Sequence, residues 1–295
     1  MSFNTPEQIA DAAVETGTKR AFMTPDKMLV GGFLAGAYIA FGGLLSMAVS
    51  SGLDPKTWGT LPTLFSGAVF SVGLMLVVLA GSELLTGNMA YLPIAALRRR
   101  VSIGRVGIGL AIVLVGNLLG SLFVAYFLSV KAGVIGTPKS PAGTPPLLIY
   151  EKLKTIATLK ALTETDWQIF LRAVGCNWLV CLAVWLALSA NDTGGKILGI
   201  FFPILAFVAI GFDHVVANMF FLPAAIFAHV PGIGWGDTLN NWLWAFLGNL
   251  VGAAVFVSTA YWFMYLRGTP DEGATDHGRA GQPGAESRLA PARRQ

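Results

Sequence analysis

Long apolar stretches separated by short polar segments dominate the chain. An α-helix needs roughly 20 apolar residues to cross a bilayer of about 30 Å, and six regions reach this length. They cover residues 28–50, 62–96, 106–130, 170–190, 197–230 and 240–266. The second and fifth regions are too long for one simple crossing. The pattern predicts an all-α integral membrane protein with six transmembrane helices, of which the second and fifth are broken by loops.

The two longest regions carry the same motif. GSELLTGNMAYLP at residues 81–93 and GFDHVVANMFFLP at residues 211–223 share a glycine, an acid, Asn-Met and Leu-Pro at matching positions. A second echo follows each motif, with GNLLG at residues 116–120 and GNLVG at residues 248–252. Two matched pairs in the same order indicate that the chain is duplicated.

The duplication defines the domain organisation. The repeats are expected over about residues 28–130 and 170–266, linked by residues 131–169, so that a six-span membrane domain covers residues 28–266. Three crossings per copy is an odd number, so the second copy enters the membrane from the opposite side. The sequence therefore predicts an inverted 3+3 repeat, whose site lies at the repeat interface near the midplane.

Polar segments flank this domain. Residues 1–27 are expected to form a cytoplasmic amphipathic helix, with Thr5 as its N-cap and Pro6 at its first position. Residues 267–295 are rich in glycine, proline and charge, which predicts a disordered cytoplasmic tail.

Basic residues beside the spans predict the orientation. Lys19, Arg20 and Lys27 precede the first span, and an arginine cluster at residues 98–105 lies between the second and third. Cytoplasmic loops carry such an excess, so both termini are expected in the cytoplasm. The lysines of residues 131–167 oppose this assignment, but long loops contribute less to orientation. No signal peptide is visible, and the first span is expected to direct insertion.

Composition supports a membrane protein and argues against other classes. Of 295 residues, 54% are hydrophobic and 12% are charged, and the mean hydropathy is +0.64, far outside the soluble range. The net charge of +4 lies in residues beside spans, which points to topology rather than nucleic acid. Cys176 and Cys181 lie in the fourth span and are expected to be packing residues. The sequence shows no nucleophile–base pair, metal-ligand cluster or nucleotide loop, so neither an enzyme nor a cofactor is expected.

The repeated motifs predict where small anions would bind. A transmembrane helix breaks only where other protein groups or water satisfy its freed backbone, and Gly81, Gly87, Gly211 and Pro223 permit such breaks. Half-helices that begin after each break aim their positive ends inward, which favours a small anion. Four polar side chains are expected to stabilise the broken helix ends. Capping these ends is a more favoured role for them than proton transfer. The four side chains are Glu83, Asn88, Asp213 and Asn218.

His214 is the histidine that lies well inside a span. Ionisable groups at membrane depth are costly, so a functional role is favoured over a neutral imidazole packed in the core. Thr86 carries the hydroxyl of the first motif and is placed to face His214 across the repeat interface.

Five large apolar residues near the motifs are candidates for constrictions that exclude water. They are Phe70, Leu74, Leu84, Leu85 and Phe207. Their spacing alone favours plain core packing, because apolar residues inside spans need no special explanation.

Four segments together resemble a known family, the formate/nitrite transporters. They are ELLTGN (83–88), CNWLVCLAVW (176–185), FFPI (201–204) and GFDHVVANMFFLP (211–223), and the resemblance covers residues 5–266. Members are homopentameric six-span channels and transporters with an aquaporin-like protomer. The resemblance implies a multi-pass protein of the cell inner (plasma) membrane.

The resemblance also implies roles for single residues. Thr86 and His214 would be the central polar pair, Asn177 a further polar lining residue, and Lys160 the outer vestibule lysine that draws anions inward. The five apolar residues match the family's two constrictions, which reverses the preference for packing. The motif loops would be residues 83–88 and 211–217. Two departures are Asp213, where many members have Glu, and Leu85, where many have Phe.

These observations predict passage of a small monovalent anion, with formate first and nitrite or hydrosulfide as alternatives. Passage is passive or coupled to a proton, which His214 donates directly or through water. The partners are the anion, the proton, the lipid bilayer and other copies of the chain, without nucleic acid. An aquaporin-like channel for neutral solutes is the competing class, and it is disfavoured because no paired Asn-Pro-Ala motif occurs.

Overall fold

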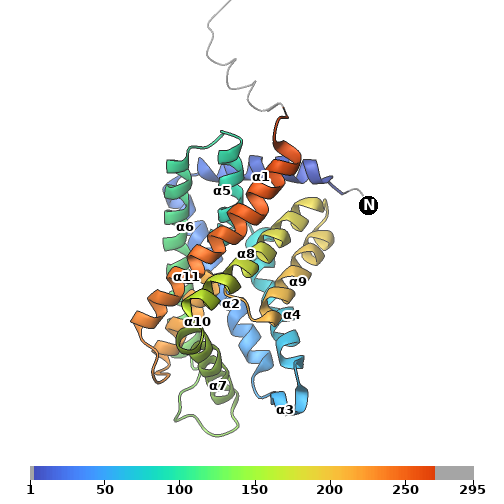
Figure 1. Cartoon of the computed structure of the whole chain (residues 1–295). Coiled ribbons are helices and arrows are strands. Elements are labelled where there is room, and N and C mark those ends of the chain that lie inside the picture. Colours follow the sequence, from blue (N-terminus) through green and yellow to red (C-terminus); the bar gives the residue numbers. More distant parts are fainter. Residues whose placement is uncertain (1–2, 270–295) are drawn as a thin grey trace, which may run out of the picture.

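The computed structural model describes residues 3–269, and this part of the chain is an all-helical bundle (Figure 1). Within it, six helices are long and apolar enough to cross a membrane. They are α2 (Pro25–Ser50), α4 (Leu61–Leu79), α6 with its π-helical extension (Ile103–Lys131), α8 (Asp166–Ser189), α9 (Thr193–Ile210) and α11 with its extensions (Trp235–Leu266). The others are α1 (Pro6–Ala21), α3 (Pro55–Trp58), α5 (Leu85–Leu97), α7 (Pro145–Thr158) with a π-turn (Leu159–Thr163), and α10 (Val215–Phe227).

The broken crossings fall where the repeated motif stands. The chain leaves α4 at Leu79 and restarts as α5, and it leaves α9 at Ile210 and restarts as α10. Gly81 and Gly211 adopt φ values of +78° and +84°, in the left-handed region that glycine enters without a Cβ clash. The second and fifth crossings are therefore interrupted, as the sequence predicts.

The loops are shorter than the resemblance implied. Residues 85–88 already belong to α5 and residues 215–217 to α10. Gly87 and Pro223 lie inside these helices and do not make the breaks. The helices restart early because side chains satisfy their first backbone groups.

Two asparagines supply that support. Asn117 Oδ1 accepts a hydrogen bond from Leu85 N at 2.8 Å, and Asn249 Oδ1 accepts one from Val215 N at 2.9 Å. Asn117 Nδ2 donates to Glu83 O, and Asn249 Nδ2 donates to Asp213 O, both at 2.9 Å. The asparagines come from the GNLLG and GNLVG echoes, so the two halves repeat their contacts as well as their sequence.

Glycines let the long helices of each half approach closely. A Cβ added at Gly116 or Gly120 of α6 would clash with backbone carbonyls of α2. Gly248 and Gly252 of α11 would clash in the same way with α8. The α2–α6 and α8–α11 pairs are thus equivalent, and both depend on backbone contact.

We expect Gly120→Ala to lower thermal stability, because the new Cβ meets the carbonyl of Phe33, and overpacking costs about 1–3 kcal/mol. Gly107→Ala in the same helix is the matched control, since nothing lies within 4 Å of its Cβ position. Thermal unfolding of the detergent-solubilised protein should show a lower Tm for the first variant alone. Equal Tm values for the two variants would contradict the close packing.

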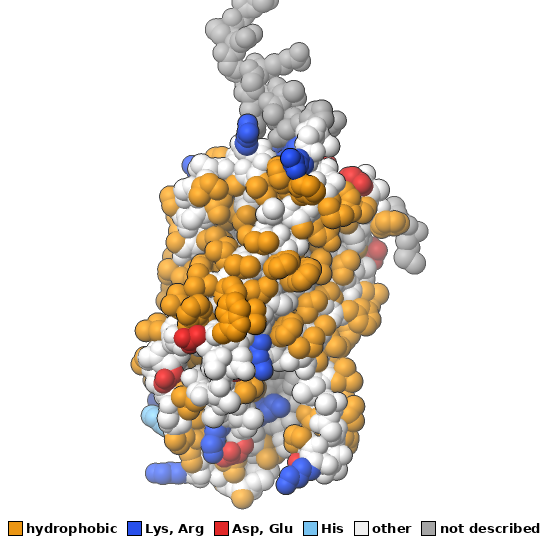
Figure 2. All heavy atoms as spheres, in the orientation of Figure 1, with side chains coloured by type: hydrophobic (Ala, Val, Ile, Leu, Met, Phe, Trp, Pro, Cys, Tyr) orange, Lys and Arg blue, Asp and Glu red, His pale blue; other side chains and the backbone are white. Residues whose placement is uncertain are grey.

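The surface of the bundle fits a membrane. Figure 2 shows hydrophobic side chains across the middle of the visible face and charged side chains toward its two ends. Helix α1 lies across one end, beside the end of the described chain at residue 269, while α3 and α7 lie at the other end (Figure 1). The expected tail, residues 267–295, lies outside the described residues from position 270 onward.

Candidate functional site

Thr86 and His214 meet in the interior, one from each repeat. Thr86 stands in the first turn of α5 and His214 is the N-cap of α10, with exposed fractions of 0% and 2%. Thr86 Oγ1 lies 2.8 Å from His214 Nε2. The structure therefore brings together the two polar residues that the sequence singled out.

The N-cap hydrogen bond that His214 makes at the start of α10 determines which ring nitrogen carries the hydrogen. His214 Nδ1 accepts a hydrogen bond from Ala217 N at 3.1 Å, which leaves no free lone pair there. In the neutral ring the hydrogen therefore sits on Nε2 and is donated to Thr86 Oγ1. The hydroxyl hydrogen of Thr86 is then available to another acceptor.

A small apolar chamber adjoins this pair. Its cavity volume is about 10 Å³, roughly the room that one water needs. The rings of Phe70 and Phe207 pack edge to face with centroids 5.7 Å apart, and Phe207 lies 5.9 Å from the His214 ring. The chamber is lined by Ile39, Phe70, Leu74, Leu84, Val180, Ile204, Phe207 and His214.

A larger cavity of about 440 Å³ opens on the other side of Phe70 and Phe207. These two rings and His214 line both cavities, so they form the wall between them. Lys160 and Arg172 bring positive charge to the larger cavity. Figure 2 shows the molecule hollowed between α7 and α4, with Lys and Arg side chains around the hollow.

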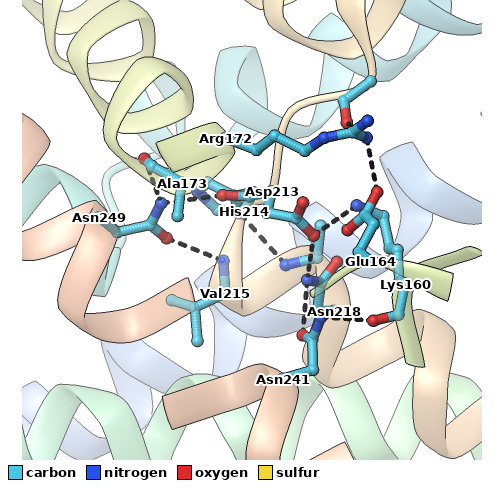
Figure 3. A network of polar contacts seen from close by, with 12 residues as sticks. Lys160, Glu164, Arg172, Ala173, Asp213, His214, Val215, Asn218, Asn241 and Asn249 are labelled. Atoms are coloured by element: carbon cyan, nitrogen blue, oxygen red, sulfur yellow. Dashed lines mark hydrogen bonds and ion pairs between the residues drawn. The ribbon is translucent and has the colours of Figure 1, made fainter. Parts of the chain in front are cut away.

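The acid of the second motif is held by a polar network (Figure 3). Asp213 Oδ1 accepts hydrogen bonds from Lys160 Nζ at 2.6 Å and from Asn218 Nδ2 at 2.9 Å. Asn218 Nδ2 also donates to Asn241 Oδ1 at 2.8 Å, and Asn241 Nδ2 donates to Lys160 O at 3.0 Å. The network fixes the loop before α10 and places the Lys160 charge beside a carboxylate.

The first motif has an equivalent network. Asn88 Nδ2 donates to Glu83 Oε2 at 2.9 Å, as Asn218 does to Asp213. Arg20 takes the place of Lys160, with Nε 3.4 Å from Glu83 Oε1 and a 2.6 Å hydrogen bond from its guanidinium to Asn88 Oδ1. Each bracing acid therefore has one cation and one asparagine.

Two expected lining residues lie elsewhere. Asn177 is fully buried and lines neither of the two cavities, and its Nδ2 donates to Thr86 O at 3.2 Å and Asn249 O at 2.8 Å. Leu85 is also fully buried but does not line the chamber that Leu84 lines. Cys181 and its neighbour Cys176 are buried free thiols.

Sequence reasoning missed several residues of the site. The sequence shows the repeated segments around Asn117 and Asn249. It does not show that these asparagines cap the helices that follow the breaks. Arg20 indicates only topology in the sequence, but α1 carries its side chain to Glu83. Glu164 and Arg172, which pair at 2.5 Å, gave no signal in the sequence.

A bundle of six membrane-crossing helices, two of them broken around a buried Thr–His pair beside an apolar chamber, defines a membrane channel or transporter for small solutes. The sequence profile of the formate/nitrite transporter family matches residues 7–263. The chain belongs to this family.

Individual relatives agree with this assignment. A probable formate transporter of Methanothermobacter thermautotrophicus is 47% identical over 275 residues, covering 90% of this chain and 98% of that protein. A formate channel of Bacillus thuringiensis is 43% identical over 267 residues, covering 90% of this chain and 98% of that protein. A solved structure, a pentameric formate channel with formate bound, matches with a TM-score of 0.70 at 27% identity, covering 82% of this chain and 98% of that one.

These matches confirm three predictions from the sequence. The family resemblance is correct, the fold is an all-α six-helix membrane fold, and the function is transport of small anions of weak acids. The protein is a multi-pass membrane protein of a family of transporters and channels.

Proposed function

We propose that the protein passes formate across the membrane, with nitrite as the second substrate. The observation that carries the proposal is the 2.8 Å contact between Thr86 and His214 beside an apolar chamber. The two relatives described above are named for formate, and the family is named for formate and nitrite.

The geometry suggests how each part of the path acts. The Lys160 charge attracts the anion into the larger cavity, and the Phe70–Phe207 wall opposes a charged species because desolvating an ion is costly. The neutral acid passes this wall more easily than the anion. Leu74 and Leu84 continue the apolar lining, and Leu85 remains a proposed member of the constrictions.

The proton step follows from the His214 hydrogen bonds. Since Nδ1 is used by the cap, His214 acts through Nε2–H and the Thr86 hydroxyl. We assign substrate hydrogen bonding to Thr86 and proton delivery to His214. Nε2 passes its proton on, directly or through water, while a proton from the aqueous side replaces it on Nε2, so the ring stays neutral. Asn177 supports the pair by holding the Thr86 carbonyl.

The assembly and orientation belong to the same proposal. The pentameric formate channel supports a homopentamer with one pore per protomer. The repeated contacts of Asn117 and Asn249 support the inverted 3+3 repeat within the 28–266 transport domain. We place the protein in the plasma membrane with both termini cytoplasmic, so that the Lys160 cavity faces outward.

Radiolabelled formate and nitrite uptake into proteoliposomes tests the proposal at two pH values. We expect uptake of both anions above the protein-free background, mutual competition, and faster formate uptake at the lower pH if a proton accompanies it. Osmotic swelling with neutral solutes is the control for the competing class. Swelling without uptake of either anion would overturn anion transport in favour of an aquaporin-like channel.

A further inference from the structure

A second acid lies beside the Lys160–Asp213 pair. Glu164 follows the π-turn after α7 and is buried, with only 9% of its surface exposed. Its Oε1 accepts a 2.5 Å hydrogen bond from the Arg172 guanidinium. Figure 3 shows its second oxygen turned toward the Asp213 carboxylate. Two buried carboxyl groups therefore face each other, each paired with a cation, Arg172 or Lys160, that lines the larger cavity.

Each of these carboxyl groups has one oxygen without a partner. In the described part of the chain, Glu164 Oε2 and Asp213 Oδ2 are inaccessible and have no hydrogen-bond partner. The first motif differs, because both oxygens of Glu83 are partnered, one by Arg20 and one by Asn88. A buried acceptor without a donor is costly, and a proton on Glu164 would supply the missing donor.

The surrounding charges are evenly balanced. Lys160 from the π-turn and Arg172 from α8 are the cations, and Glu164 and Asp213 are the anions. The other titratable groups around the cluster are Lys152 of α7 and His214, which line the same cavity, and the buried thiol of Cys176 near Asp213. With both carboxyl groups ionised the four-residue cluster is neutral, and with one proton bound it carries a net positive charge.

We propose that Glu164 and Asp213 share one proton and that its uptake gives the four-residue cluster beside the larger cavity a net positive charge that favours anion binding. This inference rests on the proposed passage of anions. The step forms an O–H bond at Glu164 Oε2, hydrogen-bonded to Asp213, with the proton taken from solvent. The proton-free state returns the cluster to neutrality and weakens the attraction for the anion.

The electrostatics of Glu164 agree with this geometry. Burial, with the nearby Asp213 carboxylate adding to it, raises the pKa of Glu164 to about 7. Because the pKa is raised, the proton is bound below this pH and lost as the pH rises through it. The extra positive charge is therefore present on the acidic side and absent on the alkaline side.

Infrared difference spectroscopy of the purified protein tests the shared proton without any transport. We expect the C=O stretch of a protonated carboxylic acid at about pH 6 and its loss by about pH 8. Glu164→Gln should abolish this change, whereas Glu151→Gln, which alters an exposed carboxylate of α7, should keep it. A wild-type spectrum without this pH-dependent C=O band would overturn the proposal, and so would a band that still titrates in the Glu164→Gln variant. The wild-type measurement does not depend on the folding of any variant.

Formate counterflow at equal pH on both sides tests the consequence. The wild-type KM should rise about tenfold between about pH 6 and about pH 8, because the protonated fraction of a group that titrates near 7 falls by that factor. Glu164→Gln keeps the acceptor for Arg172 and offers Asp213 an N–H, so its KM should stay low and change less than about twofold. Glu151→Gln should follow the wild type.

The outcomes separate this inference from the proposed function. A titrating infrared band without formate or nitrite transport would overturn the proposed function and the charge switch, but keep the shared proton. Normal transport whose KM shows the same pH dependence in wild type and Glu164→Gln would overturn the switch alone. A change confined to the maximal rate would also count against it, because the switch acts on binding.

Discussion

Thr86→Val lowers the rate of formate uptake by about tenfold to a hundredfold while the protein folds normally. Valine keeps the shape of threonine but removes the oxygen that contacts His214 Nε2 at 2.8 Å. In the proposed path the same oxygen also hydrogen-bonds the formate anion. A hydrogen bond to a charged group contributes about 1.5–3 kcal/mol, and each 1.4 kcal/mol is about a factor of ten in rate. Initial uptake rates in proteoliposomes at matched protein density measure the effect.

Matched variants separate the hydrogen bond from the helix cap. Thr86→Ser keeps the hydroxyl and should retain most of the uptake. His214→Asn keeps an N-cap acceptor for Ala217 N, so the variant should fold normally. The asparagine side chain is too short to contact Thr86, so formate uptake should be slow. His214→Phe loses both functions, and its stability should fall by about 1 kcal/mol more. Wild-type uptake by Thr86→Val would remove the central pair from the mechanism.

Lys160→Met has the largest expected effect on stability. The Lys160 ammonium lies 2.6 Å from Asp213, with side-chain exposures of 10% and 0%. Removing one partner of a buried ion pair leaves an uncompensated charge, which costs about 3–5 kcal/mol. For a protein of this size we expect a Tm lower by roughly 10 °C, together with slower anion uptake.

A double-mutant cycle tests the interaction directly. Asp213→Asn removes the charge that Lys160→Met leaves behind, so the double variant should be more stable than Lys160→Met alone. The exposed pair of Lys154 and Glu151, at 3.7 Å, is the matched control, and its removal should cost at most about 1 kcal/mol. Additive effects in the Lys160–Asp213 cycle would contradict a coupled buried pair.

The contrast between Gly81 and Gly87 shows the limit of prediction within the motif. Both glycines permit a helix break, but φ is positive only at Gly81, and Gly87 lies inside α5. The difference arises because Asn117 from another helix caps Leu85 N and lets α5 begin there. A local preference allows several break points, and a distant side chain selects one.

The sequence by itself determined the six apolar crossings, the two broken ones, the duplicated motif and the choice of Thr86 and His214 as a facing polar pair. Hydrophobic length and motif repetition are properties of the residue order alone, so they can be read without knowing any contact. The family is indicated separately, by four short segments that resemble its members.

Only the tertiary structure decided how the polar groups pair. Arg20 reaches Glu83 because α1 packs against α5, and Glu164 faces Asp213 because the turn after α7 meets the loop before α10. Partners such as these lie far apart in sequence, and nothing in residue spacing records their distance. Hydrogen bonding and charge balance in a buried site depend on that distance. The pairing of the polar groups could therefore be assigned only from the tertiary structure.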